Sequence, residues 1–154
     1  MLKKLMDRIA DAIAAADEDA VDTEERDEAI RMATAVLMID VARADHVFEE
    51  AEFDRILQLV QTHFQLPAEQ AAELVIAAND EADNLVSAYD FTKVLHDHLD
   101  HDEKARVVGL LWKIAYADGR LDKYEDSLVL KISDLLHVSR GRVMRLKHDA
   151  AHRA

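Results

Sequence analysis

The strongest constraint on the fold of this chain is an internal repeat. When residues 37–60 are laid over residues 110–133, an offset of 73, the apolar positions coincide and the tetrapeptide Ala-x-Ala-Asp recurs. One gap then brings residues 64–67 onto 136–139. Self-similarity at a fixed offset indicates that each copy is one structural unit. The repeat therefore predicts two helical hairpins with one plan, facing each other across a pseudo-two-fold axis.

Apolar residues recur at helical spacing along the whole chain, and no segment alternates with the period of two that is typical of a strand. An amphipathic helix is predicted over residues 2–16, followed by an acidic run at 17–28. We therefore expect an all-α fold, with an N-terminal amphipathic helix and acidic linker at 1–22 and a helical domain at 23–154. The further helices are predicted at 23–41, 50–64, 67–79, 89–98, 101–117 and 123–136, and after Ser139.

Cap signals mark several of these helix starts. Asp100 and Glu103 have the spacing of a capping box, in which each side chain accepts a hydrogen bond from the other residue's backbone amide. Pro67 suits a first helical position, because proline lacks the amide hydrogen that would be unbonded there. Ser139 is predicted to cap the last helix.

The composition excludes several classes of protein. The 154 residues carry 32 acids against 19 bases, a net charge of −13, and there is no cysteine. Disulfides, thiolate zinc sites, iron–sulfur clusters and cysteine nucleophiles are therefore excluded. No apolar run is long enough to span a bilayer, and no signal-peptide core follows the N-terminus. We expect a soluble cytoplasmic protein that is not itself transmembrane.

The acids of the two hairpins keep one spacing, i, i+4 and i+7. They are Asp45, Glu49 and Glu52 in the first hairpin and Asp118, Asp122 and Glu125 in the second. One interpretation is capping, because the second and third acid of each set fall where a helix N-terminus favours oxygen acceptors and negative charge. The first acid of each set follows the end of a helix, where negative charge is disfavoured, so capping explains it least.

The other interpretation is a divalent cation site. The second hairpin resembles the latter half of an EF-hand loop, but Ile114 and Tyr116 stand where that loop needs its first oxygen ligands, so it is not an EF-hand. A hard cation needs about six oxygens. Three acids per hairpin supply too few unless both hairpins, backbone carbonyls and waters contribute.

The motif Ala-x-Ala-Asp-Gly-x-Leu-x-x-x-Glu runs from Ala115 to Glu125 and recurs in degenerate form from Ala42 to Glu52, with His46 in place of the glycine. In this motif the chain resembles the tellurite-resistance TerB family over about residues 25–150, nearly its whole length. The resemblance implies a pseudo-symmetric bundle of about seven or eight helices without known enzymatic activity. Related domains occur on the N-terminal side of membrane-anchored DnaJ co-chaperones.

The resemblance also implies a role in tellurite and chemical-stress resistance, a membrane partner of the TerC type, and a divalent metal at acidic residues. Residue by residue, the motif acids correspond to the six acids named above. Ca²⁺ or Mg²⁺ is the expected ion, because both prefer oxygen ligands.

Two other clusters have a structural and a functional interpretation. His96, His98 and His101 have spacings that can hold a transition metal, but they straddle a predicted helix break, and we favour solvent-exposed polar residues between helices. The basic residues near the C-terminus are interpreted as a solvated helix face or a complement to the acidic residues 1–100, and not as a nucleic-acid site, because no aromatic is interleaved. They are Arg140, Arg142, Arg145 and Lys147.

Neither a phosphate-binding glycine-rich loop, a nucleophile elbow nor a His-Glu-x-x-His helix occurs, so an enzyme is the weaker class. The leading hypothesis is a non-enzymatic stress-response module that binds a divalent cation at the two acidic turns. The alternative is a metal-independent interaction domain that docks another protein through residues 2–16 or through a face between the hairpins.

Overall fold

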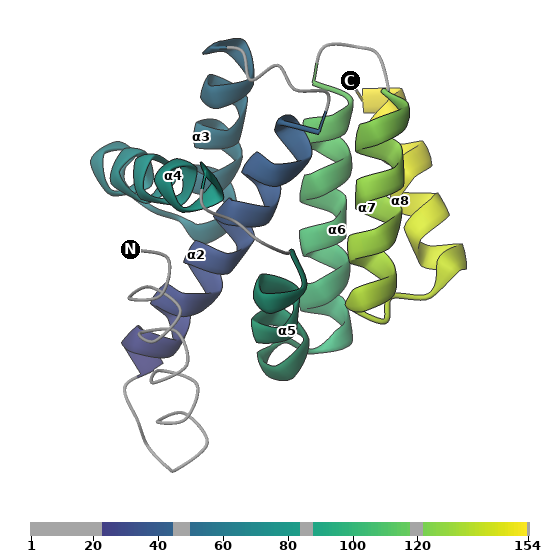
Figure 1. Ribbon diagram of the computed structural model, residues 1–154, viewed down its shortest axis with the longest axis horizontal. Helices are drawn as coiled ribbons and strands as arrows, with labels where there is room; N and C mark the ends of the chain where they lie inside the picture. Colours follow the sequence, from purple (N-terminus) through teal and green to yellow (C-terminus); the bar gives the residue numbers. More distant parts are fainter. Residues whose placement is uncertain (1–22, 45–49, 84–87, 118–121, 154) are drawn as a thin grey trace.

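The computed structural model describes residues 23–44, 50–83, 88–117 and 122–153. Within these ranges the chain forms seven α-helices and no strand, which confirms the predicted all-α class (Figure 1). The helix predicted over residues 2–16 lies outside the described residues. The helices are α2 (Thr23–Ala42), α3 (Glu50–Phe64), α4 (Ala68–Asp83), α5 (Ala88–His98), α6 (His101–Ala115), α7 (Lys123–Leu135) and α8 (Arg140–Arg153).

Helix α6 begins at the predicted capping box. The Glu103 amide donates to Asp100 Oδ1 at 2.8 Å, and the Asp100 amide donates to Glu103 Oε1 at 3.0 Å. Helix α4 differs from its prediction, because it begins one residue after Pro67 and continues to Asp83 rather than ending at residue 79. Arg43, which follows α2, donates to Asn79 Oδ1 at 2.7 Å and pairs with Asp83 Oδ1 at 2.6 Å, and these contacts hold the added last turn of α4.

The repeat is confirmed by matching hydrogen bonds at the helix ends. After α2 the Arg43 amide donates to the Ile39 carbonyl, and after α6 the Tyr116 amide donates to the Trp112 carbonyl, 73 residues further on. After α3 the Leu66 amide donates to the carbonyl of Gln61, five residues back. The last turn of α7 repeats this Schellman-type bond between Val138 and Ser133.

The repeat extends beyond the predicted hairpins to a third helix. Helix α4 packs on α2 and α3, and α8 packs on α6 and α7 in the same way. Ala71 and Ala78 of α4 and their counterparts Val143 and Ala150 of α8 are all buried. The two first helices, α2 and α6, contact each other, and the cross contacts α2 with α7 and α3 with α6 are the pseudo-symmetric pair. Helix α5 stands outside the repeat and packs on α2 and α7.

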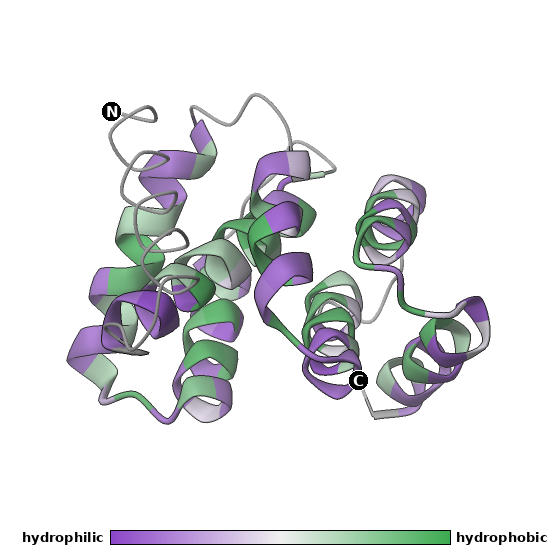
Figure 2. Ribbon diagram, turned by 90° about the horizontal axis from the view of Figure 1, so that it is seen from below, coloured by the Kyte–Doolittle hydropathy of each residue, from purple (hydrophilic) through white to green (hydrophobic). Residues whose placement is uncertain are grey.

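One hydrophobic core joins the two three-helix units. Figure 2 shows that the helices turn much of their apolar surface toward one another. Leu37, Met38 and Ile39 of α2 and Leu111 and Trp112 of α6 have no exposed surface. Full burial of such a side chain contributes roughly 1.5–3 kcal/mol, so the shared core ties the two repeats into one domain. None of the described helices is long and apolar enough to cross a membrane.

Candidate functional site

Helix α7 presents two of the six predicted site acids at its N-terminus. Asp122 is the N-cap, and its Oδ1 accepts a hydrogen bond from the Tyr124 amide at 2.7 Å. The capping interpretation of Asp122 is therefore confirmed. Glu125, at the third helical position, is only 6% exposed. Of the three described acids of the set, Glu125 is the most deeply buried.

The first hairpin carries the same third acid. Glu52, the counterpart of Glu125, lies in the first turn of α3 and is half-buried. Asp45, Glu49 and Asp118 lie outside the described residues. In the part of the chain that is described, no group of three or more His, Asp or Glu side chains is placed to hold a metal ion. Of the six predicted metal ligands, the described residues thus include only Glu52 from the first turn and Asp122 and Glu125 from the second.

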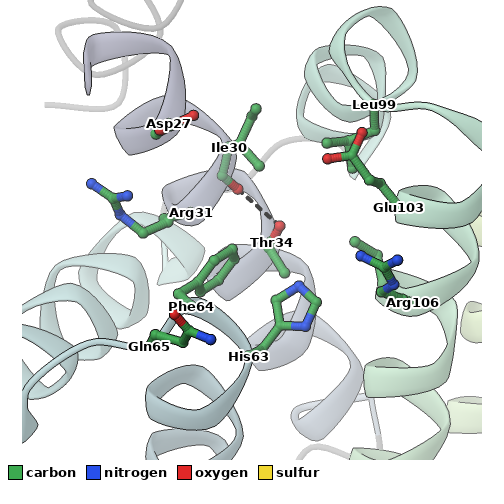
Figure 3. A pocket seen from close by; sticks show the side chains of 11 residues that line it. Asp27, Ile30, Arg31, Thr34, His63, Phe64, Gln65, Leu99, Glu103 and Arg106 are labelled. Carbon is green, nitrogen blue, oxygen red and sulfur yellow. Dashed lines mark hydrogen bonds between the residues drawn. The ribbon is translucent and has the colours of Figure 1, made fainter. Parts of the chain in front are cut away.

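A pocket of about 330 Å³ lies between the two repeats, beside the N-terminal part of α2 and the C-terminal end of α3 (Figure 3). Its walls come from the first half of α2, the last turn of α3 and the first half of α6. The lining residues that matter below are Arg31, Thr34, His63, Phe64, Glu103 and Arg106. Thr34 is fully buried, and its hydroxyl donates to the Ile30 carbonyl at 2.8 Å.

The pocket carries charges of both signs, because Asp27 and Glu103 line it together with Arg31 and Arg106. Burial lowers the pKa of His63 below its ordinary value, and the positive charges of Arg106 and Lys113 lower it further. His63 is therefore neutral at neutral pH. The sequence did not reveal this pocket, because its residues are far apart in the chain and form no local motif.

The histidines of the α5–α6 junction are not all solvent-exposed, so that expectation was wrong for two of the three. His101 is exposed, whereas His96 and His98 are half-buried in the last turn of α5. His96 Nδ1 lies 3.0 Å from Lys104 Nζ, and its ring centroid lies 4.5 Å from that of His137. His96 is thus bound to neighbouring side chains and is not the start of a three-histidine metal site.

The basic residues of α8 form a solvated face, as predicted. Arg142 pairs with Asp102 at 2.8 Å, and Lys147 pairs with Asp126 at 2.7 Å. Both acids belong to residues 101–154, so these ion pairs do not complement the acidic residues 1–100. The Arg142–Asp102 pair is exposed and contributes little stability, whereas the Lys147–Asp126 pair is half-buried.

The fold and the acidic turns define an all-helical protein built from two three-helix repeats that share one core and repeat one acid pattern. Residues 31–148 match the sequence model of the family described as tellurite resistance protein TerB. This match spans most of the chain, and the protein belongs to the TerB family. No curated protein and no solved structure matches the chain.

Proposed function

We propose that this TerB-family protein is a non-enzymatic component of a bacterial response to tellurite or other chemical stress, and that it binds Ca²⁺ or Mg²⁺ at its two acidic turns. The repetition of one acid spacing, i, i+4 and i+7, in both hairpins carries the proposal. Carboxylate oxygens are the ligands that hard cations prefer.

The acids of each turn supply these oxygen donors. Asp122 uses Oδ1 in its cap, which leaves Oδ2 for a cation. Asp118 and Asp45, the acids that capping explains least, complete the proposed carboxylate sets together with Glu49. Backbone carbonyls and waters would bring each ion to about six oxygens.

Thermal unfolding with and without cation tests the proposal. A ligand that binds only the folded state raises stability by mass action, by about 2.7 kcal/mol at one hundred times its Kd. We therefore expect Ca²⁺ or Mg²⁺ to raise the melting temperature by several degrees and chelator to reverse the rise. Asp118→Asn and Glu125→Gln, which keep side-chain volume and remove charge, should blunt the rise.

Asp54→Asn is the matched control. Asp54 is an exposed acid of α3 outside the proposed set, so its substitution removes the same charge without touching a turn. The cation-dependent rise should survive it. If neither cation changes the melting temperature at millimolar concentration, the proposal that the protein binds a metal is wrong.

The second candidate is metal-independent docking of another protein, with a TerC-type membrane protein as the expected partner. This candidate would use a face between the repeats, where the structure has the pocket described above. Binding of a purified TerC-type protein should then persist in chelator and be lost when residues 1–20 are deleted. Binding that requires Ca²⁺ or Mg²⁺ would exclude this candidate.

A further inference from the structure

The pocket has a pseudo-symmetric counterpart in the second repeat. The α2 residues that line it correspond, at the offset of 73, to the N-cap and the first half of α6. These pairs are Asp27 with Asp100, Ile30 with Glu103, Arg31 with Lys104 and Thr34 with Val107. The last turn of α3, which closes the pocket, corresponds to the last turn of α7. The fold therefore has two pseudo-symmetric positions, the pocket beside the end of α3 and the corresponding position beside the end of α7.

Helix α5 occupies the place beside α7. It packs on both α2 and α7, and its His96 reaches Lys104, the counterpart of Arg31. Lys104 is only 6% exposed, so in this repeat the cation is covered by a helix and has a nitrogen acceptor. Among the described residues, no helix takes the equivalent place beside α3. Of the two pseudo-symmetric positions, the one beside α7 is covered by α5, and the one beside α3 is the pocket.

The guanidinium groups of Arg31 and Arg106 at the pocket have no hydrogen-bond acceptor in the part of the chain that is described. Neither Arg31 nor Arg106 forms a hydrogen bond or an ion pair there. Figure 3 shows His63 below Thr34 and Arg106 to its right on α6, with Arg31 at the left rim pointing away from both. Arg31 and Arg106 therefore keep N–H donors available beside the pocket, although the charge of Arg106 also acts on Asp102, one turn earlier in α6.

We propose that this pocket binds a small monocarboxylate, with the carboxylate seated between Arg106 and His63 and its apolar body against Ile30, Phe64 and Val107. A guanidinium presents paired N–H donors that match the two oxygens of a carboxylate. A neutral imidazole can donate one further hydrogen bond. Asp27 and Glu103 line the same pocket, and their negative charges disfavour ligands with a second anionic group.

The volume agrees with a ligand of this class. About 330 Å³ lies at the lower end of the range for small-molecule sites, which is roughly 300–1,000 Å³. An aromatic or short-chain acid fits this space. This site is separate from the acidic turns, so it stands or falls independently of cation binding.

Nuclear magnetic resonance of the full chain in chelator, titrated with phenylacetate, tests the proposal. Phenylacetamide, which has the same shape without the charge, is the reference ligand. We expect phenylacetate to shift the signals of Thr34, His63 and Val107 with a Kd on the order of millimolar, because a ligand of this size has little surface to bury. Phenylacetamide should bind at least about tenfold more weakly, since it lacks the charge-assisted hydrogen bonds.

The pKa of His63 provides a second readout. A carboxylate beside the imidazole favours its charged form, so saturating phenylacetate should raise the pKa of His63. The other charged groups facing this ring are Arg106 and Lys113 on α6, together with Asp27, Arg31 and Glu103 at the pocket wall. These groups are present with and without ligand, so the change in pKa reports the added anion.

Arg106→Gln should weaken phenylacetate binding by at least about tenfold. The matched control is Arg145→Gln, which removes an exposed arginine of α8 far from the pocket in sequence and should leave binding unchanged. The proposal is overturned if phenylacetamide shifts the same signals equally, if binding survives Arg106→Gln, or if the shifts gather on α8. Failure here would leave the cation-dependent melting shift untouched, and the reverse also holds.

Discussion

Gln65 and His137 lie 72 residues apart and adopt the same left-handed backbone conformation, with φ of 54° and 62°. Each follows the last residue or turn of the second helix in its repeat, and each is spanned by the Schellman-type bond described above. Left-handed angles are costly for residues that carry a Cβ. In both copies of the repeat, the second helix therefore ends at a non-glycine residue with a strained left-handed conformation.

Relief of this strain is the first prediction. Gln65→Gly should raise the free energy of unfolding by about 0.5–1 kcal/mol, because glycine adopts positive φ without steric cost. Gln65 is exposed, so little packing is lost. Chemical denaturation measures the change. Gln58→Gly, in the exposed middle of α3, is the control and should lower stability by about 1 kcal/mol. A loss of stability in both variants would contradict the prediction.

The sequence was sufficient for the repeat and for the helices, because apolar period and cap residues are local signals. The left-handed residues were not predictable in this way, since Gln65 and His137 are not glycines. Their shared position in the repeat was the only signal that could have revealed them. The alignment of residues 64–67 with 136–139 had already placed them together.

The site could be predicted only in part for a physical reason. Helix-start spacing predicts where Asp122 and Glu125 sit, but it does not give the burial of Glu125, which depends on how α7 packs in the fold. The pocket depends on tertiary contact between α2, α3 and α6, so no local pattern indicates it. His96 shows the same limit, because its burial follows from the packing of α5 against α7.

Asp40 gives a prediction about pH. Burial raises the pKa of its carboxyl above the ordinary value, and the charges of Arg43 and Lys131 oppose this only in part. The folded state therefore holds this proton more tightly than the unfolded chain. Its contribution to stability is present below the ordinary pKa and is lost as the pH rises through the raised folded value.

Asp40→Asn should accordingly stabilise the protein at neutral pH and have a smaller effect near pH 3, where the native carboxyl is also protonated. Unfolding by urea at the two pH values measures the difference. Asp54→Asn on the exposed side of α3 should show no such pH-dependent gain. If Asp40→Asn destabilises the protein at neutral pH, the attraction to Arg43 and Lys131 outweighs the desolvation of the charge.

His63 gives a prediction of the opposite sign. Its folded pKa is lowered, first by burial and then by Arg106 and Lys113. The unfolded chain therefore takes up the proton more readily, so stability is lost as the pH falls from above about 6.5 toward the folded pKa. A titration of the His63 ring signals should show the lowered pKa directly.

Arg106→Gln should raise the pKa of His63 only part of the way to its ordinary value, because burial is the larger cause. Arg145→Gln removes a charge of the same sign from α8 and should leave the titration unchanged. A His63 pKa that does not respond to Arg106→Gln would mean that burial and Lys113 set it without Arg106.

The ammonium group of Lys147 on α8 contacts residues of two other helices, Asp126 of α7 and Trp112 of α6. Its Nζ lies 2.7 Å from Asp126 Oδ1 and 5.2 Å from the ring centroid of Trp112, which is fully buried. Lys147→Met keeps most of the apolar stem and removes the charge, so we expect the free energy of unfolding to fall by about 1 kcal/mol.

Lys123 provides the control, because it lies at the same 5.2 Å from the Tyr124 ring but this pair is exposed. Lys123→Met should therefore change stability far less. Trp112 is the only tryptophan, so its fluorescence can follow both unfolding transitions. Equal losses in the two variants would show that burial adds nothing to the Lys147 contact.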